Sequence, residues 1–163
     1  MNNPRAISLI EDCSSDLERI SLIIEVLGGT NRAIPYLTKY SIIKVCGTLE
    51  QCFKTIISDF STLNQNQQLK NYVDFTFRES SINPNLINIY KSLAKFDVNW
   101  KNNFKRMLNA DENKERIVDS LKSLNNARNE FAHGGNPLTT FNDIENYFID
   151  AKTIIEYIDA SME

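Results

Sequence analysis

Apolar residues recur at helical spacing along almost the whole chain, and this period is the feature that most limits its fold. Leu17, Ile20, Ile24 and Leu27 show it near the start of the sequence. The last segment repeats it, with side chains that we expect to face a core: Ile144, Tyr147, Phe148, Ala151, Ile154, Ile155 and Ile158. No segment alternates apolar and polar residues as a strand would. The sequence therefore predicts an all-α protein, a helical bundle.

Capping residues, prolines and glycines divide this pattern into separate helices. Asn3-Pro4 begins the first helix, because asparagine caps well and proline suits the first helical position. Gly28-Gly29 ends it. The second helix is expected over about 31–60, and its apolar side chains are all predicted to lie in the core: Tyr36, Tyr40, Ile43, Leu49, Phe53, Ile56, Ile57 and Phe60.

The rest of the chain follows the same rules. A polar link over 61–68 leads to a weaker helix containing Tyr72, Phe75 and Phe77. Later helices are expected to start at three caps: Asn83-Pro84, Asp97 and Asn142. A long helix over about 112–132 is ended by the Gly-Gly-Asn-Pro stretch at 134–137. With no linker and no repeat in view, residues 1–163 are expected to form one domain.

The overall charge limits the classes of partner. With 18 basic and 21 acidic residues, the formal net charge is −3, which argues against a protein that binds nucleic acid non-specifically through its whole surface. A local patch that engages a short stretch of RNA remains open. No run is apolar and long enough for a membrane span, and none resembles a signal peptide, so no membrane association is expected.

Cysteine and histidine usage limits the chemistry. Cys13, Cys46 and Cys52 are odd in number and lack metal-binding spacing, which favours reduced thiols in a cytoplasmic protein. The chain has one histidine, His133, so one chain cannot build a histidine-rich metal site. No metal and no cofactor are expected.

The end of the long helix carries the residues best suited to chemistry. Arg128 falls in an apolar stripe formed by Ile117, Leu121, Leu124 and Phe131, where the pattern would place a leucine. Asn129 and His133 share a neighbouring face. An arginine suits the charge of a phosphate, and an imidazole beside it suits proton transfer. The alternative is a helix-end histidine near the negative pole of the helix and an arginine in an ion pair, and residue types alone favour this alternative.

A family resemblance changes that balance. Arg128-Asn129-Glu130-Phe131-Ala132-His133-Gly134 resembles the Arg-x4-6-His signature of HEPN domains, helical bundles that include many RNA-cleaving enzymes. Glu50-Gln51-Cys52-Phe53-Lys54 resembles the Glu-x3-Lys element found in part of that family. The region 83–134 is similar to the RiboL-PSP-HEPN group. The resemblance implies a HEPN-like helical bundle across the chain.

The resemblance also implies an activity. It implies metal-independent RNA cleavage that leaves a 2′,3′-cyclic phosphate and a 5′-hydroxyl, with the site formed between two subunits. His133 would transfer protons, Arg128 would stabilise the transition state, and Asn129 would orient the phosphate or the imidazole. Glu50 would hold Arg128, and Lys54 would contact RNA, although a solvated lysine is at least as good an interpretation. A two-fold homodimer would supply the second histidine.

Three functions follow as hypotheses. The first is a ribonuclease of stress response or phage defence, a toxin restrained by an antitoxin or other regulatory protein. The second is a non-catalytic HEPN-type module that binds RNA, a nucleotide or a protein partner, and the third is a structural dimer. HEPN toxins modified by a nucleotidyltransferase carry a tyrosine two places after the histidine. Gly135 occupies that place here, which argues against a toxin pair of that type.

A second basic segment, 100–106, mixes basic and aromatic residues. Lys101, Lys105 and Arg106 are candidates for RNA contacts, because such a mixture can follow single-stranded RNA. The plainer interpretation, in which Trp100 and Phe104 are core residues and the basic side chains are solvated, is the favoured one.

Overall fold

A computed structural model describes all residues, 1–163, and confirms the all-α prediction: the chain contains no strand. Its elements are α1 (Pro4–Leu27), α2 (Ile34–Ser61), α3 (Gln67–Val73), the π-helical turn η1 (Asp74–Arg78), α4 (Leu86–Phe96), α5 (Val98–Ala110), α6 (Lys114–Ala132) and α7 (Phe141–Ala160). None of these helices is long and apolar enough to cross a membrane.

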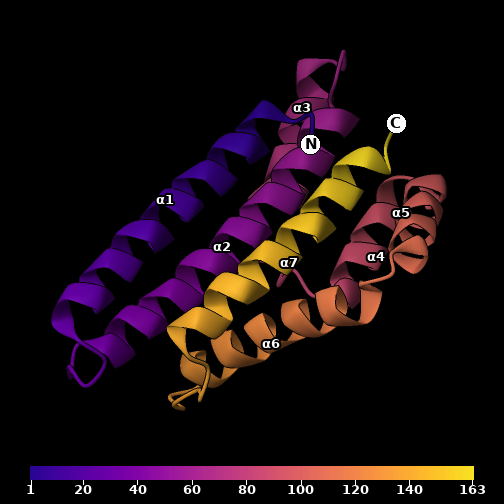
Figure 1. Cartoon of the computed structure of the whole chain (residues 1–163). Helices are drawn as coiled ribbons and strands as arrows, with labels where there is room; N and C mark the ends of the chain where they lie inside the picture. Colours follow the sequence, from indigo (N-terminus) through magenta and orange to yellow (C-terminus); the bar gives the residue numbers. More distant parts are fainter.

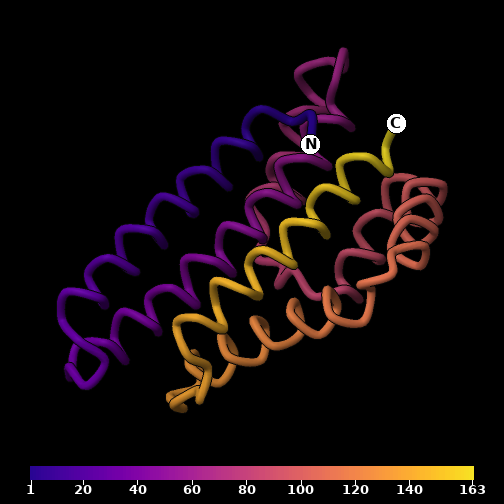
Figure 2. Tube along the Cα trace, viewed as in Figure 1, coloured from indigo at the N-terminus to yellow at the C-terminus, as the bar shows by residue number.

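Three long helices form the body of the bundle. Figure 1 shows α1, α2 and α7 side by side, with α2 between the other two. α6 packs along α7, and α4 and α5 pair at the far end of α6. The chain path in Figure 2 shows that the loop from α1 to α2 and the loop from α6 to α7 lie at the same end. Thirty buried apolar residues form one cluster through this arrangement, with Phe53, Leu124 and Ile154 among the most deeply buried.

Two helix caps match the predictions and two do not. Asn3 accepts from the Ala6 N–H (2.9 Å), and Asp97 caps α5 as expected. α4, however, is capped by Asn85 rather than Asn83, and the Asn85 side chain accepts from the Asn88 N–H (2.8 Å). α7 is capped by Thr140 rather than Asn142.

The cap of α7 has a clear physical reason. The Thr140 hydroxyl accepts from the Asp143 N–H (3.2 Å), and the Asp143 carboxylate accepts from the Thr140 N–H (2.9 Å). This reciprocal capping box satisfies two helix-end donors at once.

The core prediction for α2 is wrong at four positions. Tyr36, Tyr40, Ile43 and Phe60 are 74, 53, 42 and 41% exposed. Tyr36, Tyr40 and Ile43 lie in the first half of α2, on a face that α1, α6 and α7 leave uncovered, whereas Phe60 lies at the end of α2 and packs only partly, against Trp100. Apolar character alone does not show which face of a long helix meets its neighbours. The uncovered face begins beside the end of α6, where the predicted site lies.

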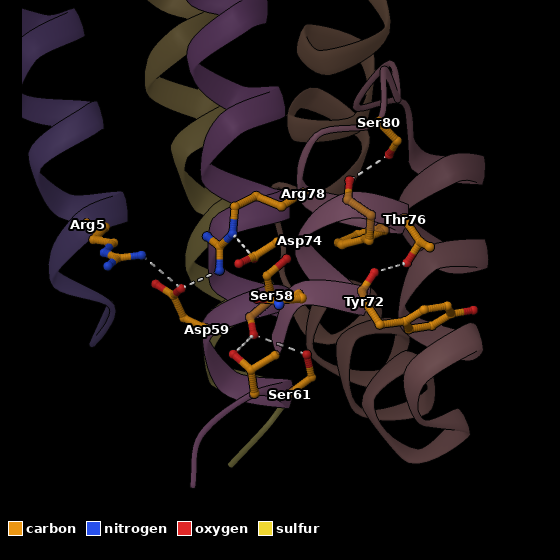
Figure 3. A network of polar contacts seen from close by, with 12 residues as sticks. Arg5, Ser58, Asp59, Ser61, Tyr72, Asp74, Thr76, Arg78 and Ser80 are labelled. Carbon is orange, nitrogen blue, oxygen red and sulfur yellow. Dashed lines mark hydrogen bonds and ion pairs between the residues drawn. The ribbon is translucent and has the colours of Figure 1, made fainter. Parts of the chain in front are cut away.

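The weak helix predicted after residue 68 is α3 followed by the π-helical turn. The Glu79 N–H donates to the Asp74 carbonyl, five residues back (2.9 Å). Arg78 fixes the turn by pairing with Asp74 and Asp59, each at 2.6 Å, and Arg5 also reaches Asp59 (3.3 Å). Figure 3 shows this network joining α1, α2 and η1. It anchors the segment that leads to Asn83 and the site.

The three cysteines are free and buried, as the sequence suggested. Burial raises the pKa of the Cys46 and Cys52 thiols to about 12, and it also raises that of Cys13. Their thiols are therefore protonated at neutral pH and poor nucleophiles.

Candidate active site

The end of α6 exposes His133. His133 is the C-cap residue, and its N–H donates to the Asn129 carbonyl (3.1 Å). Gly134 then adopts a left-handed conformation (φ +81°), and the Gly135 N–H donates to the Glu130 carbonyl (2.8 Å). A Cβ at Gly135 would lie 2.9 Å from the Glu130 carbonyl oxygen, so a larger residue does not fit without a shift. The two glycines turn the chain away directly after His133 and leave its ring exposed.

Arg128 lies half-buried one turn earlier and makes no ion pair. Its Nη1 donates to the Asn129 Oδ1 (3.2 Å), and no carboxylate lies within salt-bridge distance. Burial raises the pKa of the Cys46 thiol, and the positive charge of Arg128 partly opposes that rise, which places the guanidinium near this residue of α2. The predicted alternative, an arginine in an ion pair, is therefore wrong. A half-buried cation without an anion favours an anionic ligand.

Asn129 connects Arg128 to the segment before α4. Its Oδ1 accepts from Arg128 and also from the Asn83 Nδ2 (3.4 Å). The structure thus brings Arg128 and Asn129 into contact and places His133 at the next turn of the same helix. The His133 ring is exposed and makes no hydrogen bond within the chain, so it is free to meet another molecule.

Glu50 does not hold Arg128 as the resemblance implied. Its carboxylate accepts from the Lys54 Nζ (3.0 Å) and from the Ile82 N–H (3.1 Å). Lys54 also donates to the Ser80 carbonyl (2.6 Å) and is 2% exposed, so it faces neither RNA nor solvent. The Glu50–Lys54 pair instead holds the segment 80–82, which leads to Asn83 and its contact with Asn129. No hydrogen bond or ion pair joins Glu50 to Arg128.

We expect Lys54→Met to lower the free energy of unfolding by about 3 kcal/mol, because in a largely buried position it leaves the Glu50 carboxylate without its cation and the Ser80 carbonyl without its donor. Urea unfolding followed by circular dichroism measures this. Lys105→Met, at an exposed lysine, is the matched control and should change stability by less than about 0.5 kcal/mol. Equal losses in the two variants would contradict a structural role for Lys54.

The second basic segment lies away from this site. Trp100 packs edge-on against Phe60 (5.3 Å between centroids), and Phe104 is fully buried, which confirms the plainer interpretation. Lys105 and Arg106 are exposed on α5, and Lys101 is half-buried. α5 precedes the start of α6, whereas Arg128 lies fourteen positions along α6, roughly 20 Å further at 1.5 Å per residue. Any RNA contact by these three residues is therefore remote from Arg128 within one protomer.

A pocket that the sequence did not reveal opens beside Asn129. It lies between α4 and α6, has a volume of about 310 Å³, and is lined by amides and aliphatic side chains: Asn83, Asn85, Leu86, Ile87, Val118, Leu121, Lys122, Asn125, Asn126 and Asn129. The asparagines at 83–85 and 125–129 are visible in the sequence. Their meeting across two helices depends on the packing of α4 against α6, which no local pattern encodes.

The uncovered face of α2 borders the site on its other side. We call it the α2 stripe: Tyr36, Tyr40, Ile43 and Gly47, all exposed. Lys39, next to the stripe, lies over the Phe131 ring (5.5 Å) and donates to the Asn136 Oδ1 (2.6 Å), which ties this part of α2 to the end of α6. A Cβ at Gly47 would meet no atom within 4 Å. Nothing within the chain therefore requires a glycine there, in the interior of a helix that glycine weakens.

No group of three or more His, Cys, Asp or Glu side chains is arranged to bind a metal ion.

Comparison with known proteins gives one match. The family model described as RiboL-PSP-HEPN matches residues 3–163, almost the entire chain. No curated protein and no solved structure gives a significant match.

Proposed function

Since the chain belongs to the RiboL-PSP-HEPN family, we propose that it is a metal-independent endoribonuclease whose site combines Arg128 and His133 from two protomers of a homodimer. Membership of the family points more broadly to a nuclease-like or RNA-binding module. The observation that carries the finer proposal is the half-buried Arg128, which has no acidic partner and lies one turn before the exposed His133.

The chemistry needs few groups. A base removes the proton of the 2′-hydroxyl, and the 2′-oxygen forms a bond to phosphorus while the bond to the 5′-oxygen breaks. An acid protonates that leaving oxygen, which gives a 2′,3′-cyclic phosphate and a 5′-hydroxyl. In our proposal histidine supplies the base and the acid, and Arg128 stabilises the extra negative charge on the phosphate oxygens. Asn129 positions the guanidinium through the hydrogen bond described above.

The dimer follows from the single histidine. One imidazole cannot be poised as base and acid at the same moment, and in our proposal a second His133 from another copy takes the other role. The α2 stripe offers the surface, because it is apolar, exposed and adjacent to the end of α6. A second copy packed on this stripe would be related by a two-fold axis and would bring its own Arg128 and His133 to the same cleft. Gly47 would let the two backbones approach closely.

The setting that we propose is a toxin or phage-defence effector restrained by an antitoxin or other regulatory protein that binds it. Nucleotide modification of a tyrosine is not the means of restraint in this proposal. Gly135 stands in that position, and a Cβ there would clash with Glu130. Restraint by a bound protein needs no modified side chain.

The test is RNA digestion by the purified protein in excess chelator. We expect cleavage, with cyclic phosphate and 5′-hydroxyl ends identified by mass spectrometry, and a dimer by sedimentation velocity at the assay concentration. Cleavage that requires added divalent metal, or products with 3′-hydroxyl ends, would contradict the mechanism. A strict monomer that cleaves RNA would contradict the composite site.

One observation favours the second candidate, a non-catalytic module that binds RNA, a nucleotide or a protein. Within one protomer the His133 ring makes no hydrogen bond to Arg128 or Asn129, so no hydrogen-bonded network joins the base to the phosphate-binding side chains in the free chain. Intact RNA after long incubation of the dimeric protein, together with saturable RNA binding, would favour this module over the enzyme.

A further inference from the structure

The pocket beside Asn129 combines a flat apolar lining with amides. Leu86, Ile87, Val118 and Leu121 supply aliphatic surface from α4 and α6. Its volume of about 310 Å³ is at the small end of ligand pockets, which span about 300–1,000 Å³. Such a site suits a compact planar ligand with an apolar face and a polar edge.

Asn125 contributes a hydrogen-bond acceptor that nothing in the chain satisfies. The residue is 5% exposed, and its Nδ2 donates to the Leu121 carbonyl (2.8 Å) and to the Pro84 carbonyl (3.5 Å). These two bonds fix the orientation of the amide. The Oδ1 is therefore the remaining atom, and it is buried with no partner. A buried acceptor without a donor is unfavourable, so a ligand that supplies an N–H gains from meeting it.

Asn129 contributes the complementary donor one turn later. Its Oδ1 accepts from Arg128 (3.2 Å) and Asn83 (3.4 Å), which fixes this amide as well. Its Nδ2 donates to nothing within the chain. Residues four apart share one face of a helix, and both asparagines line the pocket, so a buried acceptor and a free donor lie one turn apart in its wall.

We propose that this pocket binds one nucleobase of single-stranded RNA, the base next to the phosphate held by Arg128. The inference rests on the proposed ribonuclease function for the position of that phosphate. Every RNA base has an edge on which an N–H donor adjoins an acceptor, and its faces pack on aliphatic side chains. Because Asn129 contacts both the pocket and Arg128, base and phosphate fit within the length of one nucleotide. The base that the pocket accepts would thus determine which phosphodiester bond of the RNA is cleaved.

The test is binding of the four ribonucleoside 3′-monophosphates, followed by NMR of the asparagine side-chain amides. We expect at least one of them to shift the Asn125 and Asn129 amide signals in a saturable way. Ile87→Trp, at a 65% exposed residue of the pocket wall, should fill the pocket without disturbing the core and weaken binding by about ten-fold or more. Ile149→Trp, at a 59% exposed isoleucine of α7, is the matched control and should leave binding unchanged.

Asn125→Leu removes the unmet acceptor, together with the Nδ2 hydrogen bonds to the Leu121 and Pro84 carbonyls, so circular dichroism has to show an unchanged fold. We expect it to weaken binding of the preferred mononucleotide by about ten-fold, because the donor of the base then faces a methyl group. RNA cleavage without any mononucleotide-induced shift of the amide signals, or shifts that persist in Ile87→Trp, would contradict nucleobase binding in the pocket. Neither outcome would contradict the ribonuclease proposal. Saturable, Ile87-dependent binding without RNA cleavage would support the pocket and count against the ribonuclease.

Discussion

An equimolar mixture of wild-type protein and the His133→Ala variant, after subunit exchange, is expected to cleave RNA at about one quarter of the rate of wild type at the same total concentration. The reason is the single histidine of each chain. If base and acid are the His133 rings of two protomers, then only dimers with two wild-type subunits are active. Random pairing makes those about one quarter of the total. Cleavage of a fluorescently labelled RNA measures the rate.

The pure variants set the scale for this experiment. His133→Ala should lower the cleavage rate by about 100-fold or more, the range expected when a general acid or base is removed. Arg128→Ala should do the same, and Arg128→Lys should recover little, because lysine lacks the planar fork that grips two phosphate oxygens. Asp119→Ala, at an exposed position of α6 outside the motif, is the control. Circular dichroism and sedimentation velocity should show an unchanged fold and dimer throughout.

The mixture separates two mechanisms that the pure variants cannot. A site complete within each protomer would give about half of the wild-type rate at equimolar mixing, since each wild-type subunit would act alone. A rate near one half of the wild-type rate would therefore rule out a site shared between two protomers, even if both pure variants were inactive. If pure His133→Ala cleaves RNA at the full wild-type rate, His133 has no role in catalysis.

Helix positions could be predicted from the sequence, because caps, glycines and prolines act through neighbouring residues. Asn3, Asp97 and Gly134 work as predicted. The errors arose where two local signals competed. Asn85 and Thr140 cap their helices in place of Asn83 and Asn142, and at Thr140 the capping box decides between the two nearby candidates. The exposed face of α2 was missed because its cover depends on helices distant in the sequence.

The candidate site was only partly predictable for the same reason. Arg128, Asn129 and His133 lie within two turns of one helix, so helical geometry alone placed them together. Glu50 is far from them in the sequence, and its actual partners, Lys54 and the Ile82 N–H, depend on how the segment before α4 folds back on α2. The pocket could not be predicted either, because it forms only where α4 and the segment before it pack against α6. A resemblance between motifs identifies residue types, but it does not show which of them touch.

Gly47→Leu is expected to abolish the dimer and, with it, RNA cleavage, while the helical fold persists. A Cβ at Gly47 would meet no neighbouring atom within 4 Å, and Gly47 is exposed, so the added side chain has room to point into solvent. It should even favour the helix itself by about 1 kcal/mol, the usual gain when glycine is replaced inside a helix. A side chain added at this position can therefore weaken the dimer only by steric exclusion of another molecule. In our proposal, that molecule is the second copy, whose α2 stripe packs here.

Sedimentation velocity measures the loss of the dimer in Gly47→Leu, and the RNA assay measures the loss of cleavage in the same sample. Gly47→Ala should weaken the dimer less, because one methyl group lets the backbones stay closer together. Glu11→Leu, at an exposed position of α1, controls for the added apolar surface and should leave both dimer and cleavage unchanged. A Gly47→Leu protein that remains dimeric and active would place the interface elsewhere. One that remains dimeric but inactive would mean that RNA, and not a second protomer, approaches the helix at Gly47.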